Sequence, residues 1–140
     1  MWTHEHVIET DVAPAAIWQV LRDIDSWAAW DTSLEEIKIH GPFAVGTEIS
    51  MTPKGQDAIR STITTVQENE VYADETRLDN VILRFSHTLA RLASGGTQVR
   101  HRLEITGPTA DQVGPELGPA ITEDFPEAMD ALIARAQEVD

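Results

Sequence analysis

The sequence has 140 residues, a length that fits one domain with a buried core. Hydrophobic residues make up 41% and include four tryptophans, which favours a folded globule over a disordered segment. With 24 acidic against 10 basic side chains the formal net charge is -14, so the surface repels phosphate backbones and anionic headgroups, and we expect neither nucleic-acid binding nor stable membrane insertion.

The chain contains no cysteine, which excludes disulfides, thiol nucleophiles and thiolate metal sites. Its first residues lack the basic start and apolar core of a signal peptide, and no run approaches the roughly 20 apolar residues of a spanning helix. We therefore expect a cytoplasmic protein.

The chain begins with a predicted strand over residues 3–11, in which His4 and His6 share a face with Ile8. A helix is predicted over residues 14–22, because Pro14 suits a first helical turn, where its missing N–H needs no partner.

A second, short helix is predicted around Trp27 and Trp30. Asp25 or Ser26 is expected to cap it, since a side-chain oxygen at that position accepts a hydrogen bond from the free backbone N–H groups. Trp30 comes directly before a chain reversal, which makes it a candidate wall of a cavity.

Six segments with period-two character then follow and predict six more strands. Short turns with glycine, proline, asparagine or aspartate separate them, so an antiparallel meander is favoured over parallel pairing, which needs long crossovers. The six predicted strands are residues 33–40, 47–51, 59–66, 71–77, 81–92 and 97–106.

The tail, residues 109–140, changes to apolar spacings of three and four, which predicts a helix of roughly 30 residues. Pro115, Pro119 and Pro126 interrupt this pattern, and an interior proline removes a hydrogen bond and clashes with the preceding turn. We expect a bent or segmented helix. No repeat or linker marks a second domain, so residues 1–140 are expected to form one.

The order of elements, together with several short motifs, resembles the SRPBCC superfamily, and within it the bacterial polyketide cyclase/dehydrase and lipid-transport group. The motifs are Ala13-Pro14-Ala15-Ala16-Ile17-Trp18, residues 23–30, Gly46-Thr47, Phe85-Ser86-His87, Gly95-Gly96-Thr97 and Gly107-Pro108. The resemblance implies an α+β, START-like helix-grip fold: a curved seven-stranded antiparallel sheet around a long C-terminal helix, with two short helices after the first strand. It also implies a ligand cavity between sheet and helix, while the fold alone selects no reaction.

Two predicted strands carry a histidine in the middle of an apolar face. Burying a polar ring without a partner costs roughly 1 to 3 kcal/mol, so the pair indicates a polar site or a cavity. A turn at residues 94–96 would place His87 near Leu103, with His101 one step along the same face, and the preceding hairpin would place Asp74 opposite roughly Arg84 or Phe85.

Three interpretations of the histidine pair stay open: a polar layer that fixes strand register, contact with a ligand, and acid or base catalysis. In the catalytic case His87 or His101 is the base and Asp74 or Tyr72 assists. His4 and His6 would join the pair if the first strand paired with the last, but no metal-ligand spacing supports a metal site, and we expect no metal and no cofactor.

The leading hypothesis is binding of a hydrophobic or amphipathic small molecule by a monomer or homodimer. The alternative is a polyketide cyclase or dehydratase, and the third option is a protein-interaction or stress-related module. The predicted ligand-binding residues are Trp30, Tyr72, Asp74, Phe85, His87, Leu89, His101, Leu103, Phe125, Met129 and Ile133.

Overall fold

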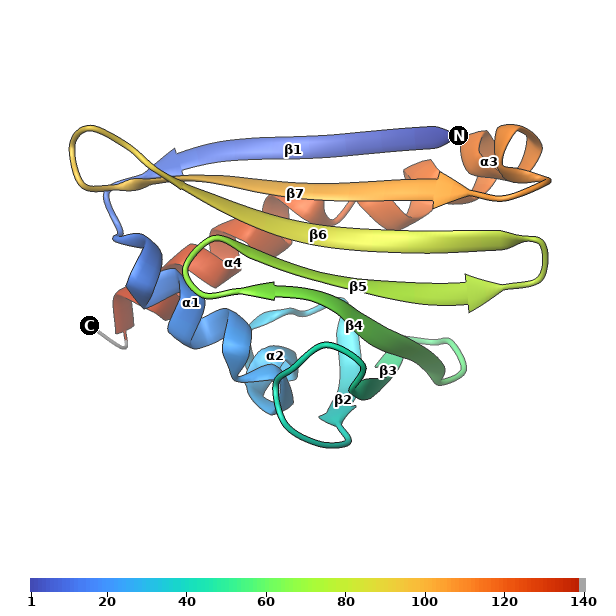
Figure 1. Cartoon of the computed structure of the whole chain (residues 1–140), viewed down its shortest axis with the longest axis horizontal. Helices are drawn as coiled ribbons and strands as arrows, with labels where there is room; N and C mark the ends of the chain where they lie inside the picture. Colours follow the sequence, from blue (N-terminus) through green and yellow to red (C-terminus); the bar gives the residue numbers. More distant parts are fainter. Residues whose placement is uncertain (139–140) are drawn as a thin grey trace.

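In the computed structural model, which describes residues 1–138, seven strands form one antiparallel sheet in the order β1-β7-β6-β5-β4-β3-β2 (Figure 1). The predicted α+β class and strand number are confirmed. The strands are β1 (Trp2–Thr10), β2 (Leu34–Ile39), β3 (Glu48–Pro53), β4 (Ile59–Gln67), β5 (Val71–Leu78), β6 (Val81–Arg91) and β7 (Thr97–Thr106).

The helices are α1 (Pro14–Arg22), a 3-10 turn η1 (Ile24–Ser26), α2 (Trp27–Trp30), α3 (Ala110–Thr122) and α4 (Phe125–Glu138). The predicted segmentation of the tail is confirmed, and residues 139–140 of that prediction lie outside the described residues. The break comes just before Pro126, which therefore occupies the first turn of α4, where a missing N–H does no harm. Pro115 and Pro119 stay inside α3.

The predicted side-chain cap of α2 is wrong. Ser26 has the nearly helical backbone angles φ -95° and ψ -2° and makes no cap hydrogen bond, because the 3-10 turn leads directly into α2 and side-chain capping uses an extended residue. The Ser26 hydroxyl donates to the Asp23 carbonyl, and the Asp25 carboxylate accepts the backbone N–H of Ile39.

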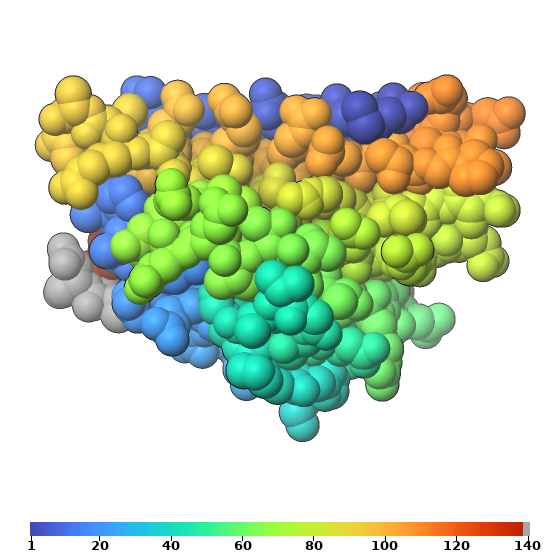
Figure 2. All heavy atoms as spheres, in the orientation of Figure 1, coloured from blue at the N-terminus to red at the C-terminus, as the bar shows by residue number. Residues whose placement is uncertain are grey.

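Irregularities in pairing accompany the curvature of the sheet. The β2–β3 register shifts between Leu34 and Glu36, and the β4–β5 register shifts between Ile63 and Thr65. Bulges of this kind bend a strand and increase its twist. The sheet curves around α3 and α4, which lie behind it in Figure 1, and the space-filling view in Figure 2 shows its outer face hiding α4 almost completely.

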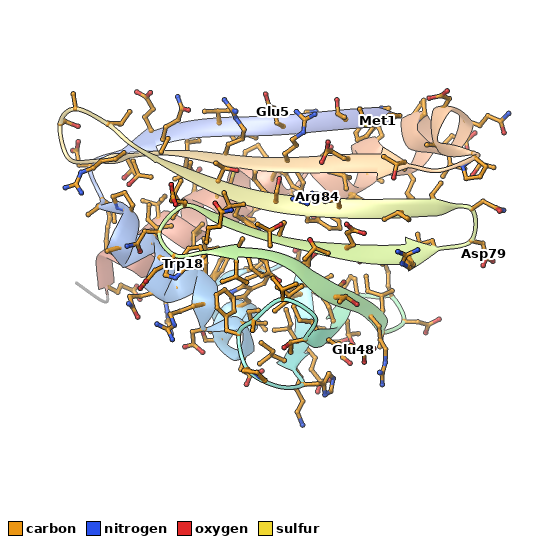
Figure 3. All side chains as sticks on the ribbon, in the orientation of Figure 1. Met1, Glu5, Trp18, Glu48, Asp79 and Arg84 are labelled. Carbon is orange, nitrogen blue, oxygen red and sulfur yellow. The ribbon has the colours of Figure 1, made fainter. Side chains whose placement is uncertain are left out.

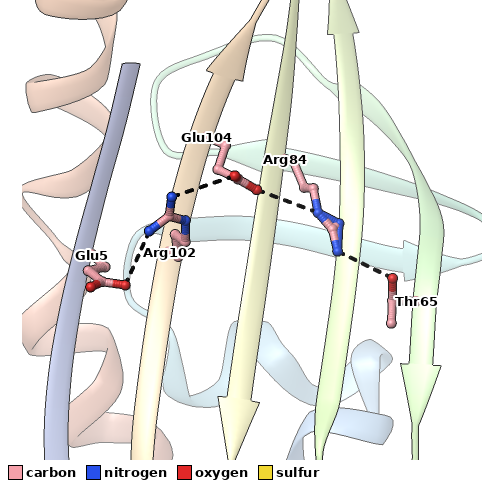
Figure 4. A network of polar contacts seen from close by, with 5 residues as sticks. All are labelled: Glu5, Thr65, Arg84, Arg102 and Glu104. Atoms are coloured by element: carbon pink, nitrogen blue, oxygen red, sulfur yellow. Dashed lines mark hydrogen bonds and ion pairs between the residues drawn. The ribbon is translucent and has the colours of Figure 1, made fainter. Parts of the chain in front are cut away.

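The outer face of the sheet carries a row of charged and polar side chains, several of which are visible in Figure 3. Arg102 lies 3.4 Å from Glu5 and 3.6 Å from Glu104, and Arg84 lies 3.7 Å from Glu104 and 3.3 Å from Thr65 (Figure 4). Each of these partly exposed surface pairs contributes only about 0 to 1 kcal/mol. Since side chains alternate along a strand, the residues between them face the concave side.

The start of β1 holds α3 against the edge of the sheet. The amino group of Met1 lies 2.6 Å from the Asp111 carboxylate, and the Trp2 indole lies against two helical glycines, Gly114 and Gly118. A Cβ added to either glycine would collide with the indole. The missing side chains therefore make room for a tryptophan from the other end of the chain.

Replacing Gly118 with alanine is expected to destabilise the protein by about 1 to 3 kcal/mol, the usual range for overpacking. In a Trp2→Ala background the same replacement should be neutral or stabilising, because alanine is the better helix former by about 1 kcal/mol. Urea unfolding of the four proteins in this double-mutant cycle measures both effects. Equal destabilisation in both backgrounds would contradict the proposed contact.

Within residues 1–138, no helix combines the length and the apolar character needed to cross a membrane.

Candidate functional site

A cavity of about 700 Å³ lies between the concave face of the sheet and the helices α2, α3 and α4. Strands β2 to β7 and the segments before β2 and after β3 complete its lining. Most of this lining is apolar or aromatic, and Asp74, His87 and His101 bring polar groups into it. The space is thus mainly apolar, with its buried polar side chains on three adjacent strands.

Seven of the eleven predicted ligand-binding residues line this cavity: Trp30, Asp74, Phe85, His87, His101, Phe125 and Met129. The other four do not line it. Tyr72, Leu89 and Ile133 pack in the core formed with α1. Leu103 packs with Val81 and Ile105 in a second core cluster. Tyr72, Leu89 and Leu103 lie on the concave face of the sheet, as predicted, and Ile133 lies on α4, but all four are packed in the core outside the cavity lining.

The two buried histidines face each other directly, which corrects the predicted pairing of His87 with Leu103. The β6–β7 register places His87 opposite His101, because the turn extends from Leu92 to Gly96, closed by a Leu92 N–H to Gly96 carbonyl hydrogen bond of 2.9 Å. The imidazole centroids are 4.0 Å apart, and the His101 ring stacks on Phe125 at 3.9 Å.

Both imidazoles are held in the neutral form. Burial lowers the pKa of His87 to about 4. Burial, together with repulsion from His87 and His6, lowers the pKa of His101 well below its ordinary value. The Nδ1 atom of each ring is buried without a hydrogen-bond partner among the described residues. Such groups are uncommon in protein interiors, because an unsatisfied buried polar atom costs about 1 to 3 kcal/mol.

Asp74 and Tyr72 form a second polar pair on β5. The Tyr72 hydroxyl donates to Oδ2 of Asp74 at 2.7 Å. Burial raises the pKa of Asp74 to about 6, although the Tyr72 hydrogen bond and the charge of Arg84 oppose the rise and Glu75 adds to it. Burial and the adjacent Asp74 raise the pKa of Tyr72. Asp74 faces Phe85, one of the two predicted partners, and lies one step along the sheet from the Tyr72–His87 pair.

Sequence reasoning missed Trp27 as a lining residue. Its indole N–H donates to the Leu21 carbonyl at 3.1 Å, and its ring meets Tyr72 and His87 edge to face, with centroids 5.6 and 5.9 Å away. Thr76 was also missed, although it shares the polar face of Tyr72 and Asp74. No local pattern marks the loop residues of the lining: Thr32, Ser33, Lys54 and Gln56.

The strand pairing brings His6 beside His101 on the opposite side from His87, so three histidines form one row across β1, β7 and β6. His4 stays exposed on β1. Within residues 1–138 no three histidine, aspartate or glutamate side chains converge as a metal site would require.

Comparison with known proteins places the chain among helix-grip folds. A family model described as polyketide cyclase / dehydrase and lipid transport matches residues 1–137. No curated protein matches the sequence significantly.

Among solved structures, a START superfamily protein from Mycobacterium smegmatis is similar at 13% identity and a TM-score of 0.77, with 99% of each chain covered. The Zhui aromatase/cyclase from Streptomyces sp. R1128 is similar at 16% identity and a TM-score of 0.78, with 96% of this chain and 93% of that chain covered. Norcoclaurine synthase from Thalictrum flavum, solved with dopamine and hydroxybenzaldehyde, is similar at 17% identity and a TM-score of 0.76, with 98% of this chain and 85% of that chain covered. At these identities the likeness is one of fold.

Proposed function

We propose that this chain, which belongs to the polyketide cyclase / dehydrase and lipid transport family, binds a hydrophobic or amphipathic small molecule of lipid or polyketide type in its cavity. The observation that carries the proposal is a mainly apolar space of about 700 Å³ whose lining includes four buried polar side chains, Asp74, Thr76, His87 and His101. Small-molecule sites typically enclose roughly 300 to 1,000 Å³ and combine apolar walls with a few placed polar groups.

The polar groups favour a ligand site over a polar layer that only fixes strand register. A register-fixing layer is stabilising when its members are satisfied, whereas both Nδ1 atoms here lack partners within residues 1–138. An unsatisfied group is tolerated at sites where function requires it. The open cavity also gives no support to the interaction-module hypothesis, which a collapsed interior would favour.

The proposal is tested by native mass spectrometry of freshly purified protein and by titration with a panel of lipids and polycyclic aromatic compounds. Trp27 and Trp30 line the cavity, so a ligand that enters it should change tryptophan fluorescence. Failure of every compound to bind, with no co-purified mass, would contradict the proposal.

A second candidate function is catalysis of cyclisation or dehydration. The observation that favours it is the raised pKa of the buried Asp74 carboxyl group. A general base works best with a pKa near the operating pH, and the pKa of Asp74 is about 6. His87, with a pKa of about 4, is mostly unable to hold an abstracted proton near neutrality. Asp74 is therefore a better candidate base than either histidine.

If the protein is such an enzyme, Asp74→Asn should lower kcat about a hundredfold or more, within the range that a positioned general base contributes, and the Tyr72 hydroxyl should still find an acceptor in the amide. Asp124→Asn is the matched control, because Asp124 also lines the cavity but is exposed. Turnover assays with a carbonyl substrate found in the panel measure the effect. Unchanged kcat with altered affinity would assign the protein to the binding function.

A further inference from the structure

The charges that line the cavity are unbalanced. Asp31, Asp74 and Asp124 contribute carboxyl groups, and Lys54 is the one cationic side chain in the lining formed by the described residues. No arginine within residues 1–138 reaches this lining, although arginine is the usual partner of carboxylates and phosphates. The two histidines inside the cavity are uncharged near neutrality because burial lowers their pKa values.

Asp74 is the deepest of these carboxyl groups. It is 9% exposed, whereas Asp31 is half-buried and Asp124 is exposed. Tyr72 is its hydrogen-bond partner within residues 1–138 and occupies Oδ2, which leaves acceptor capacity on a side chain that lines the cavity. A buried carboxylate next to open space is stabilised by a cation placed there, because both charges are poorly screened.

Aromatic rings surround the same space. Trp27, Trp30, Phe85 and Phe125 all line the cavity, and the face of an aromatic ring attracts a cation within about 6 Å of its centre. The formal net charge of -14 adds a long-range field that draws cations toward the protein and repels anions. The groups that line the cavity and the net charge of the whole protein therefore both favour a cation.

We propose that the ligand of this cavity is an amphipathic amine, whose ammonium group pairs with Asp74 while its aromatic or aliphatic body lies against the aromatic walls. This inference rests on the proposed binding function and narrows it to a chemical class. The ammonium group has three donors for the free acceptor positions of Asp74. Fatty acids and other carboxylates are expected to bind poorly. Their negative charge would lie near the negative charge of Asp74, and no cationic side chain of the lining within residues 1–138 lies beside Asp74 to balance the two.

Three naphthalene probes that differ in their head group test the inference: 2-naphthylethylamine, 2-naphthylethanol and 2-naphthylacetate, titrated near neutral pH. The amine is expected to bind about tenfold to a hundredfold more tightly than the alcohol, in line with hydrogen bonds to charged groups. The carboxylate should bind most weakly. In Asp74→Asn the advantage of the amine over the alcohol should disappear, while the affinity for the alcohol stays the same.

Asp130→Asn is the matched control, since Asp130 lies on α4, is exposed and does not line the cavity, and it should keep the preference for the amine. Equal binding of amine and alcohol, tighter binding of the carboxylate, or an amine preference that survives Asp74→Asn would overturn the inference and leave the binding function intact. Absence of binding by all three probes would overturn both.

Discussion

Replacing Ala128 with tryptophan is expected to abolish ligand binding without loss of stability. Ala128 lies on α4 with its side chain in the cavity lining, so a larger side chain extends into open space. Overpacking destabilises a filled core by about 1 to 3 kcal/mol, but an indole that enters an existing cavity gains apolar contacts instead. We expect affinity to fall about a hundredfold or more, with an unchanged or higher Tm.

Ala134→Trp is the matched control, because Ala134 lies on the same helix, is exposed and does not line the cavity. It should leave both affinity and Tm close to those of the parent protein. Titration of any compound identified in the panel, followed by thermal unfolding, measures both quantities. Retained affinity in Ala128→Trp, or a clear drop in Tm, would mean that ligands bind elsewhere or that this space is already filled.

Removing both buried histidines is expected to reverse the pH dependence of stability between about pH 7 and pH 5. Because the folded pKa of His87 lies near 4, below its ordinary value of 6.5, the unfolded chain binds protons in this window that the folded chain refuses. Its contribution is present above pH 6.5 and is lost as the pH falls, by about 1.4 kcal/mol per pH unit. His101 acts in the same direction.

Asp74 acts in the opposite direction. Its folded pKa of about 6 lies above its ordinary value of 3.8, so the folded state holds a proton that the unfolded state releases. Stability is therefore gained as the pH falls below about 6 and lost as it rises through that value. In the parent protein two histidines outweigh one carboxyl group, and the free energy of unfolding should fall on mild acidification. In the double variant His87→Leu/His101→Leu the opposing effect of Asp74 remains without that of the two histidines. The free energy of unfolding of this variant should therefore rise on mild acidification.

Urea unfolding followed by tryptophan fluorescence at the two pH values gives the free energies of unfolding. His40→Leu is the control, because His40 is exposed and its ring contacts only the Ser50 hydroxyl by hydrogen bond among the described residues, and its replacement should preserve the slope of the parent. At neutral pH the double variant should also be more stable than the parent, since it loses two unsatisfied Nδ1 atoms. A double variant that is destabilised by acid as steeply as the parent would refute the assignment of neutral, buried imidazoles.

Much of the fold could be predicted because its signals are local. Period-two runs identified the strands, Pro14 marked the start of α1 correctly, and apolar spacings of three and four identified the helical tail. The failures came where a neighbouring element supplies the partner. The expected cap on α2 did not form because η1 already leads into that helix in a helical conformation.

The candidate site was predicted only in part for the same reason. Alternation along two strands placed His87 and His101 on the concave face, and both line the cavity. Alternation also placed Leu103 and Leu89 on that face, where packing separates them from the open space. A strand pattern identifies the face of a sheet, but not how far a partner element stands from it.

The sequence by itself determined the class of fold, the number of strands and the face on which the two histidines lie, because these follow from the periods of strand and helix. Only the tertiary structure decided that the imidazoles stack on each other, that Tyr72 donates to Asp74 and that loop residues such as Lys54 reach the cavity. These features depend on turn length, strand register and packing between segments distant in the chain. A one-residue change in register moves side chains to other partners while the local pattern stays the same.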